Sequence, residues 1–310
     1  MKRWKTTVGM SREEWLSYRK KGIGGSDAGA ICGLNPYASA LTVYLDKIGE
    51  LPEKEDTESM RQGRDLEEYL AARFMEETGK KVRRANAIFQ DDEYPFLIAD
   101  VDRLIVGEKA GLECKTASPY NASHWEDGHV PDSYYLQCQH YMMVTGMECW
   151  YLAVLIFGRE FKYVPIERDE ELIGYLRTIE VEFWQNHVCA RNMPDPDGSR
   201  AADEVLARYF PEEKEDSVEM PGFDLRLKRR TEIGELIEKL EAEKRQIEQE
   251  VKKYLADRNA QHGISSSYRV SWKEIVSSRL DTKRLKEEQP EVYQRYQNQN
   301  VSQRLTIKAA

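Results

Sequence analysis

An apolar run at residues 96–106, FLIADVDRLIV, is the feature that most constrains how this chain can fold. Its length and its β-branched residues are typical of a strand near the centre of a sheet. Residues 107–111 supply a turn, and residues 112–116 return as a second strand. The sequence therefore predicts a β-hairpin inside the core of the protein.

Charged side chains gather at one end of this hairpin. Because side chains alternate along a strand, Glu113 and Lys115 share one face, while Leu112 and Cys114 take the other. A hairpin of this length can also bring Asp102, on the outgoing strand, beside Glu113. We therefore expect two carboxylates and one ammonium group at one end of a buried sheet.

Such a cluster suits metal-assisted hydrolysis of a phosphodiester. Mg²⁺ prefers carboxylate, carbonyl and water oxygens, and it keeps positions open for phosphate. When bound, it lowers the pKa of a water and stabilises the charge that develops during hydrolysis. Lys115 would hold or help to deprotonate the attacking water, or neutralise the phosphate. The alternative is a solvent-facing pair of charges, because Glu-x-Lys is a common tripeptide.

The two acidic residues and the lysine belong to a longer, ordered set of motifs. Asp102, the ECK tripeptide at 113–115 and a downstream QCQ at 137–139 resemble the PD-(D/E)xK nuclease signature. More narrowly, the chain resembles the YqaJ-type viral recombinases, which are relatives of the phage lambda exonuclease. The segments that carry this resemblance follow the family's order and span about residues 10 to 165: GIGGSD at 22–27, GRDLE at 63–67, IADVD at 98–102, GLECK at 111–115 and YLQCQHYM at 135–142.

The resemblance implies an α/β fold with a PD-(D/E)xK, restriction-endonuclease-like core, in which a central mixed sheet is flanked by helices. A C-terminal helical arm and a small α+β extension would follow. We expect the exonuclease core at residues 1–192, a linker at 193–222, and the arm with a basic C-terminal extension at 223–310. Apolar residues at heptad spacing predict a long helix in the arm, at about 223–259. The basic tail could contact DNA, dock a partner or be simple surface charge.

The resemblance also assigns roles to residues near the hairpin. Asp102 and Glu113 would bind a metal ion together with the backbone carbonyl of Cys114. Glu67, on a helix expected at 57–78, matches a carboxylate that supports a second metal ion, although a Glu on a charged helix is usually solvated.

One further residue would act on the water. Gln137, on a helix expected at 131–146, would position the attacking water together with Lys115. Two alternatives stay open: Asp100 shares a strand face with Asp102, and Gln139 is the rival of Gln137.

A second group of residues would bind the DNA end. The GIGGS turn at 22–26 leads into a helix for which Ser26 is a candidate N-cap, and free backbone N–H groups there can bind an anion. By resemblance, Arg19 and Ser26 lie where the lambda-type enzymes hold the 5′-phosphate of the degraded strand, and a plain helix cap is the alternative. Trp125, in a polar loop at 118–131, would line the substrate groove and stack on bases.

Net charge and cysteine content set limits on this interpretation. The formal net charge of −9 has the wrong sign for a protein that wraps DNA with its whole surface, so we expect a local basic groove and a marked dependence on metal and salt. Five scattered cysteines indicate neither a disulfide framework nor an iron–sulfur cluster. The chain has no membrane-length apolar run and no apolar signal region, so we expect a cytoplasmic protein; the resemblance adds a phage or prophage origin in a bacterial host.

The function that the resemblance implies is a Mg²⁺-dependent 5′-to-3′ exonuclease that uses two ions, with Mn²⁺ able to substitute. It would digest linear double-stranded DNA and leave 3′ single strands for an annealing protein. The resemblance further implies a homo-oligomer in the form of a ring, such as a trimer. The alternatives are a structure-specific endonuclease of the same fold and a non-catalytic DNA-binding or adaptor protein, but the intact acid–acid–lysine set favours an enzyme.

Overall fold

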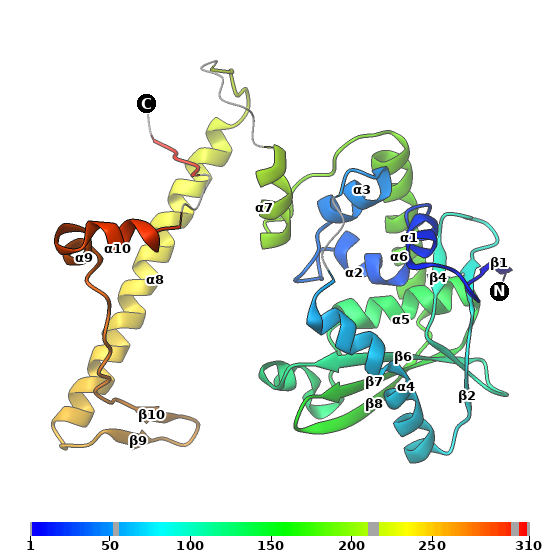
Figure 1. Cartoon of the computed structure of the whole chain (residues 1–310), viewed down its shortest axis with the longest axis horizontal. Coiled ribbons are helices and arrows are strands. Elements are labelled where there is room, and N and C mark those ends of the chain that lie inside the picture. The colour runs from blue at the N-terminus through cyan, green and yellow to red at the C-terminus, as the bar shows by residue number, and fades with distance from the viewer. Residues whose placement is uncertain (1, 52–55, 210–216, 299–303, 309–310) are drawn as a thin grey trace. The chain divides into compact units, whose positions relative to one another are not determined.

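The computed structural model describes residues 2–51, 56–209, 217–298 and 304–308. The chain divides into two compact units, one up to residue 210 and one from residue 211 onward. The first unit contains the central sheet and the five motif segments between residues 22 and 142 (Figure 1). None of the helices in the described ranges combines the length and the apolar character needed to cross a membrane.

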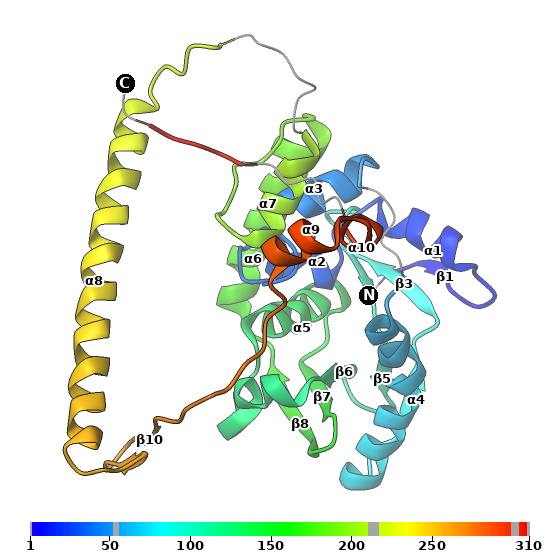
Figure 2. The ribbon, with the colours of Figure 1, turned by 60° about the vertical axis from the view of Figure 1, so that its left-hand side comes forward.

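A five-stranded mixed sheet forms the centre of the first unit (Figure 2). Its strand order is β2-β5-β6-β7-β8; β6 and β7 are parallel, and the other neighbouring pairs are antiparallel. β7 and β8 form an antiparallel hairpin at one side of this sheet. The strands are β2 Val82–Arg84, β5 Arg103–Ile105, β6 Ala110–Ala117, β7 Cys149–Ile156 and β8 Glu160–Glu167.

The apolar run at 96–106 forms two strands instead of the single strand that we expected. β4 Ile98–Asp100 pairs with β3 Ala87–Gln90 in a small sheet completed by β1 Lys2–Thr6, whereas β5 belongs to the large sheet. The chain leaves one sheet for the other at residues 101–102, so Asp102 lies at the break. A continuous apolar run indicates that a segment is buried, but it does not indicate where the backbone bends.

Helices cover both faces of the large sheet, which confirms the expected nuclease-like architecture. On one face, α4 Glu58–Thr78 contributes Phe74 to a buried cluster with Leu112 of β6. On the other face, α5 Asp132–Thr145 brings the ring of Tyr141 to 5.0 Å from the ring of Trp150 on β7. The alternation of side chains along the strands thus supplies an apolar residue to each helix layer.

Smaller helices pack around α5 and the small sheet. α2 lies close against α5. The approach is so close that a Cβ atom added at Gly29 would lie 2.9 Å from the Cα atom of Ser133. Residues Ala202 and Val205 of α7 are buried, so part of the segment that we expected as a linker packs with the core. These helices are α1 Arg12–Arg19, α2 Gly25–Ile31, α3 Ala40–Ile48, α6 Glu170–Phe183, which continues into a π-helical turn at Trp184–Cys189, and α7 Arg200–Leu206.

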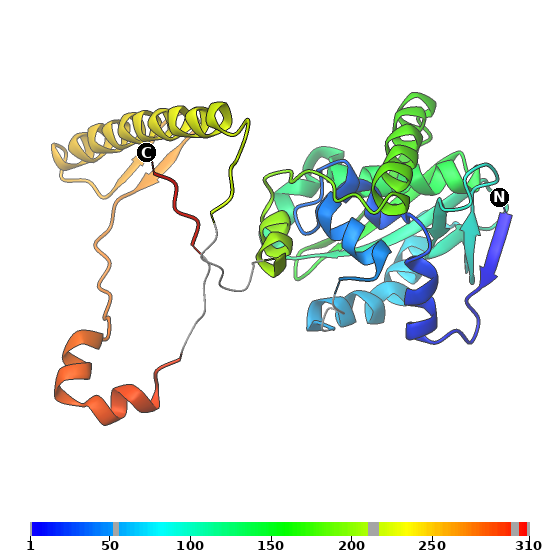
Figure 3. The ribbon, with the colours of Figure 1, turned by 90° about the horizontal axis from the view of Figure 1, so that it is seen from above.

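The second unit is built on one long helix, α8 Asp224–Ala256, which agrees with the helix expected at 223–259 (Figure 3). A two-stranded antiparallel hairpin follows, made of β9 His262–Ile264 and β10 Arg269–Ser271. Two short helices then complete the unit, α9 Thr282–Glu288 and α10 Pro290–Arg295. Leu255 is the only buried residue on α8, so the charged side chains of this helix lie in water.

Candidate active site

Residues from both predicted groups line one pocket, which has a volume of about 230 Å³. The pocket lies where the break between β4 and β5 and the middle of β6 meet α1, α2 and α5. The fold therefore brings together residues that are more than one hundred positions apart in the chain. The predicted residues in its lining are Arg19, Ser26, Asp102, Glu113, Lys115 and Gln137.

The carboxylate cluster is fixed by a short chain of hydrogen bonds. Oδ2 of Asp102 accepts a hydrogen bond of 2.9 Å from the backbone N–H of Cys114, which ties the break before β5 to β6. Oε1 of Glu113 accepts from Nζ of Lys115 at 2.6 Å and from Nε2 of Gln137 at 2.7 Å. Because Glu113 is only 4% exposed, the pair that it forms with Lys115 is not the solvent-facing pair considered above.

Burial and mutual repulsion shape the electrostatics of this cluster. Burial, together with the negative charges of Glu113 and Glu67, raises the pKa of Asp102 well above its usual range. Burial opposes the charge of Lys115, but the carboxylates of Glu113 and Asp102 outweigh it and raise the pKa of the ammonium group. The site thus holds a firmly protonated lysine beside carboxylates that repel one another, which is where a further positive charge would be stabilised.

The donor atoms of this cluster fit a hard divalent cation. Nothing among the described residues hydrogen-bonds to Oε2 of Glu113, although this oxygen is buried. No group of three or more His, Cys, Asp or Glu side chains in the described ranges is arranged to hold a metal ion, so carbonyl and water oxygens would complete the coordination. Mg²⁺ accepts such a partly hydrated site with one or two carboxylates. The role of the Cys114 carbonyl remains a prediction.

Glu67 approaches the cluster from α4, but its carboxylate already has a partner. It forms an ion pair with Arg103 of β5, whose side chain is 4% exposed, whereas the side chain of Glu67 is 31% exposed. Glu67 was expected to support a second metal ion, but in this structure its carboxylate is already paired with Arg103.

The structure distinguishes Gln137 from Gln139, but it does not distinguish Asp100 from Asp102. Asp100 lines the same pocket as Asp102, and its Oδ2 accepts a hydrogen bond from the indole N–H of Trp15. Gln139 lies away from the pocket, because its side chain bonds the carbonyl of Glu167 at 2.8 Å and the N–H of Asp169 at 3.1 Å. The geometry therefore favours Gln137 over Gln139, and it leaves both aspartates at the site.

The two residues predicted to bind the DNA end are in contact with each other. Nη2 of Arg19 donates to Oγ of Ser26 over 2.6 Å, and the guanidinium lies 4.7 Å from the ring of Trp15. Ser26 is not the N-cap that we expected. The N-cap of α2 is Gly24, whose N–H donates to Oδ2 of Asp27 at 2.9 Å. The hydroxyl of Ser26 is consequently available to face the pocket.

Trp125 does not occupy the position that we expected for it. Its side chain is 3% exposed and stacks against Tyr134, with ring centroids 5.8 Å apart, so the indole is covered and cannot stack on a base. It lies in a turn of 3₁₀-helix, Pro119–Gly128, which buries an aromatic side chain inside a segment of polar composition. Polar composition alone could not reveal this burial.

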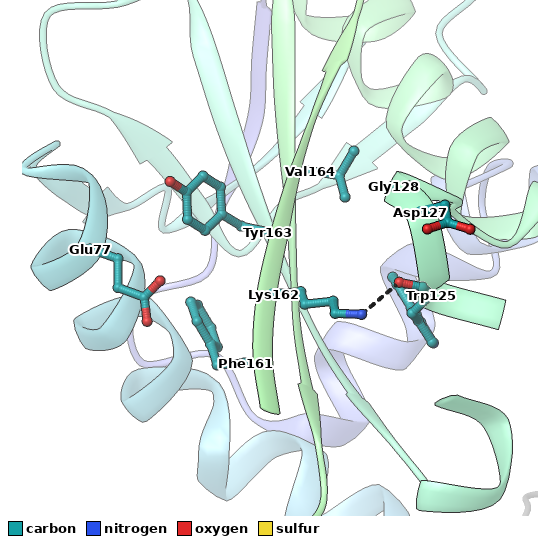
Figure 4. A pocket seen from close by; sticks show the side chains of 8 residues that line it. All are labelled: Glu77, Trp125, Asp127, Gly128, Phe161, Lys162, Tyr163 and Val164. Carbon is teal, nitrogen blue, oxygen red and sulfur yellow. Dashed lines mark hydrogen bonds between the residues drawn. The ribbon is translucent and has the colours of Figure 1, made fainter. Parts of the chain in front are cut away.

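Trp125 instead borders a second pocket, of about 390 Å³, which is built around β8 (Figure 4). Nζ of Lys162 donates to the carbonyl of Trp125 at 3.0 Å on one side of the strand. Phe161 and Tyr163 lie on the other side, toward Glu77. None of the carboxylates of the cluster lines this pocket, so we place the chemistry in the smaller one.

Two residues of the smaller pocket were missed in the sequence. The hydroxyl of Tyr141 accepts a hydrogen bond of 2.7 Å from the side-chain amide of Gln137. Trp15 contacts both Asp100 and Arg19. Its position four residues before Arg19, on the same face of α1, is the signal that could have identified it.

Taken together, a mixed sheet flanked by helices and an acid–acid–lysine set at its central strand β6 and the break before β5 define a protein with the PD-(D/E)xK nuclease fold. The sequence profile of the YqaJ-like viral recombinase domain matches residues 14–148. The chain is also 43% identical to the uncharacterized protein YqaJ of Bacillus subtilis (strain 168) over 304 residues, which cover 96% of this chain and 95% of that one. The chain therefore belongs to the YqaJ family of viral recombinases.

Solved structures agree with this fold. The alkaline exonuclease LHK-Exo of Laribacter hongkongensis superimposes with a TM-score of 0.50 at 20% identity, over 64% of this chain and 97% of that protein. Its complex with dAMP gives a TM-score of 0.51 at 21% identity with the same coverage. At this level of identity the likeness concerns the fold alone.

Proposed function

We propose that this protein is a Mg²⁺-dependent exonuclease that digests linear double-stranded DNA in the 5′-to-3′ direction and leaves 3′ single strands. One observation carries the proposal: the Asp102–Glu113–Lys115 cluster shares a pocket with the Arg19–Ser26 pair. A site for hydrolysis and a site for a terminal phosphate would thus lie side by side, as an enzyme that starts from a DNA end requires. Membership of the YqaJ family supports the same reading.

The metal ion would be held by Asp102 and Glu113, with the Cys114 carbonyl as a further ligand. Mg²⁺, for which Mn²⁺ would substitute, supplies charge to neutralise the phosphate during hydrolysis. Oε2 of Glu113 suits this role because it is buried without a hydrogen bond from any described residue. Because the cluster is acidic, phosphate would be repelled until the cation is present, so DNA binding should itself depend on the divalent ion.

The other residues of the pocket would orient the reactants. The ammonium group of Lys115 would hold the attacking water and stabilise the negative charge on the phosphate. The amide of Gln137, fixed between Glu113 and Tyr141, would keep that water in line with the bond to the leaving 3′ oxygen. Arg19 and Ser26 would donate hydrogen bonds to the 5′-phosphate, with Arg19 held in place by the ring of Trp15.

The wider setting follows the family. We propose that the protein acts in homologous recombination beside a single-strand annealing protein, in the cytoplasm of the bacterial host of a phage or prophage. A homo-oligomeric ring, such as a trimer, would enclose the duplex. The exonuclease core, expected at residues 1–192, would also include α7 from the segment expected as a linker, and residues 223–310 would form the arm.

The experiment that tests this function compares linear and closed circular DNA. We expect the protein with Mg²⁺ to release mononucleotides from a linear duplex with 5′-phosphates and to leave the circle intact. Lys115→Ala should lower the rate by about 10²–10³-fold, the range typical of losing one group that stabilises developing negative charge. Lys109→Ala is the matched control, because Lys109 lies on the same hairpin and pairs with Glu148 in water.

Other results would point to other functions. Cleavage of the circle would indicate a structure-specific endonuclease. DNA binding without metal-dependent cleavage of either substrate would indicate a non-catalytic DNA-binding or adaptor protein.

A further inference from the structure

Arg103 is a buried cation that the proposed chemistry does not use. It is the first residue of β5 and immediately follows Asp102, and it is 3% exposed. A guanidinium carries its positive charge at any pH at which the protein is folded. Such a group is rarely buried unless its donors are paired, so its partners should show why it lies here.

All the partners of Arg103 lie at the edge of the carboxylate cluster. Nη1 donates to Oε1 of Glu67 and to the backbone carbonyl of Asp102, the latter at 2.9 Å. Nη2 donates to Oε2 of Glu68 at 3.0 Å. Arg84, opposite Arg103 in the sheet, also donates to Oε2 of Glu68, at 2.7 Å. The guanidinium therefore links the acidic pair on α4 to the backbone of a proposed metal ligand.

This arrangement changes what Glu67 can do. Its charge is felt at Asp102, yet its Oε1 is already neutralised by a permanent positive charge that is covered by protein. A divalent cation bound to Glu67 would lie beside that guanidinium and repel it. Moving Arg103 away would leave a buried cation without its partner, which proteins tolerate poorly.

We propose that Arg103 is a positioning residue that occupies Glu67 and leaves the cluster with a single high-affinity position for a divalent cation, at Asp102 and Glu113. This inference rests on the proposed function, and it replaces the second metal ion expected from the sequence with a fixed positive charge from the chain. The guanidinium of Arg103 thereby neutralises Glu67, the third carboxylate of the site.

The test measures the number of metal ions bound per chain, not the cleavage of DNA. Mn²⁺ is titrated into the full-length protein by calorimetry, and free Mn²⁺ is followed in parallel by electron paramagnetic resonance. Wild type should bind one Mn²⁺ per chain tightly, and Glu67→Gln should bind the same number. Arg103→Met, which keeps the length and apolar stem of the side chain, should release Glu67 and add a second tightly bound ion.

Glu68→Gln is the matched control, because Glu68 also bonds Arg103 but its side chain is 65% exposed. It should leave the number of bound ions at one. A purely structural tie between α4 and the sheet would change the melting temperature of the variants without changing this number. If Arg103→Met fails to fold, the proposal is tested by comparing the number of Mn²⁺ ions bound to Glu67→Gln and to wild type.

Two ions in wild type and one in Glu67→Gln would overturn the proposal, because Glu67 would then be a metal ligand in spite of Arg103. One ion in a folded Arg103→Met would overturn it as well. A protein that shows the expected pattern of ions but cuts no DNA would contradict only the proposed function. A protein that binds no Mn²⁺ would contradict both.

Discussion

The sheet of the first unit and the long helix of the second use the same charged residues in opposite ways. At the sheet, Lys115 and Glu113 pair at 2.6 Å with Glu113 almost fully buried. On α8, Arg245 and Glu241 are 3.9 Å apart, and both side chains are 63% exposed. A buried charge costs free energy unless it is paired and hydrogen-bonded, whereas an exposed pair contributes little either way.

The comparison teaches that burial, more than residue type, separates the charges of the candidate site from those of α8. Glu-rich and Lys-rich segments fill α8, yet its ion pairs are the ordinary ones between residues three or four positions apart. The first unit instead places Glu113 and Arg103 where water cannot solvate them. The free energy that this burial costs is understandable if those charges must bind ions or phosphate. The three predictions below test the contrast between buried and exposed pairs.

The largest effect on stability is expected at a buried pair outside the pocket. Nδ1 of His140 lies 2.9 Å from both carboxylate oxygens of Glu180, and Nε2 lies 2.8 Å from the carbonyl of Ile98. When Glu180 is ionised, all these partners only accept, so both ring nitrogens donate and the ring carries a positive charge. Glu180→Ala would leave that charge buried and unpaired, and should lower the free energy of unfolding by about 3–5 kcal/mol.

Urea unfolding of the full chain, followed by tryptophan fluorescence, measures this loss. Glu182→Ala is the control, since Glu182 lies on the same helix, α6, but is exposed. It should change the free energy of unfolding by no more than about 0.5 kcal/mol. Equal effects of the two substitutions would break the contrast between buried and exposed charges.

The sequence predicted the helices at 57–78 and 131–146 because their ends carry local signals. Thr57 caps α4, and Gly79 and Gly146 end α4 and α5 in the left-handed conformation. The sheet was predicted less well. The run at 96–106 divides between two sheets, and the backbone bend that divides it depends on tertiary packing that apolar patterning does not encode.

The site shows the same limit. The alternation along β6 was enough to place Glu113 and Lys115 on one face, and both line the pocket. The pairing of Glu67 with Arg103 could not be foreseen, because it joins residues 36 positions apart on a helix and a strand. The prediction for Trp125 was wrong for a related reason, because its partners Tyr134 and Lys162 come from other elements.

A smaller effect is expected when pH changes the charge of the buried histidine while both partners remain. Burial favours the neutral ring, but the carboxylate of Glu180 and the carbonyl of Ile98 outweigh it and raise the pKa of His140 above 6.5. The negative charge of Asp27 also raises the pKa of His140. The stabilisation by the charged ring is therefore complete below pH 6.5 and is lost as pH rises through the folded-state pKa.

Urea unfolding of wild type and His140→Gln between pH 6 and pH 9 tests the sign. The difference in the free energy of unfolding between the two proteins should be largest at the acid end and should shrink toward the alkaline end. A difference that grows with pH would mean that the ring is neutral in the folded protein. In that case the pair with Glu180 would be an ordinary hydrogen bond.

The smallest effect is expected on α8. Arg245→Gln removes the charge that faces Glu241 while keeping a residue of similar helix propensity, so the loss should be about 0.3–0.5 kcal/mol. Amide hydrogen exchange across α8 in the full chain would show this as about a twofold faster exchange near the substitution. The effect should disappear at about 1 M salt, where charges are screened within about 3 Å. A loss several times larger that persists in salt would mean that this pair is shielded from water, and the helix would then belong with the buried charges of the sheet.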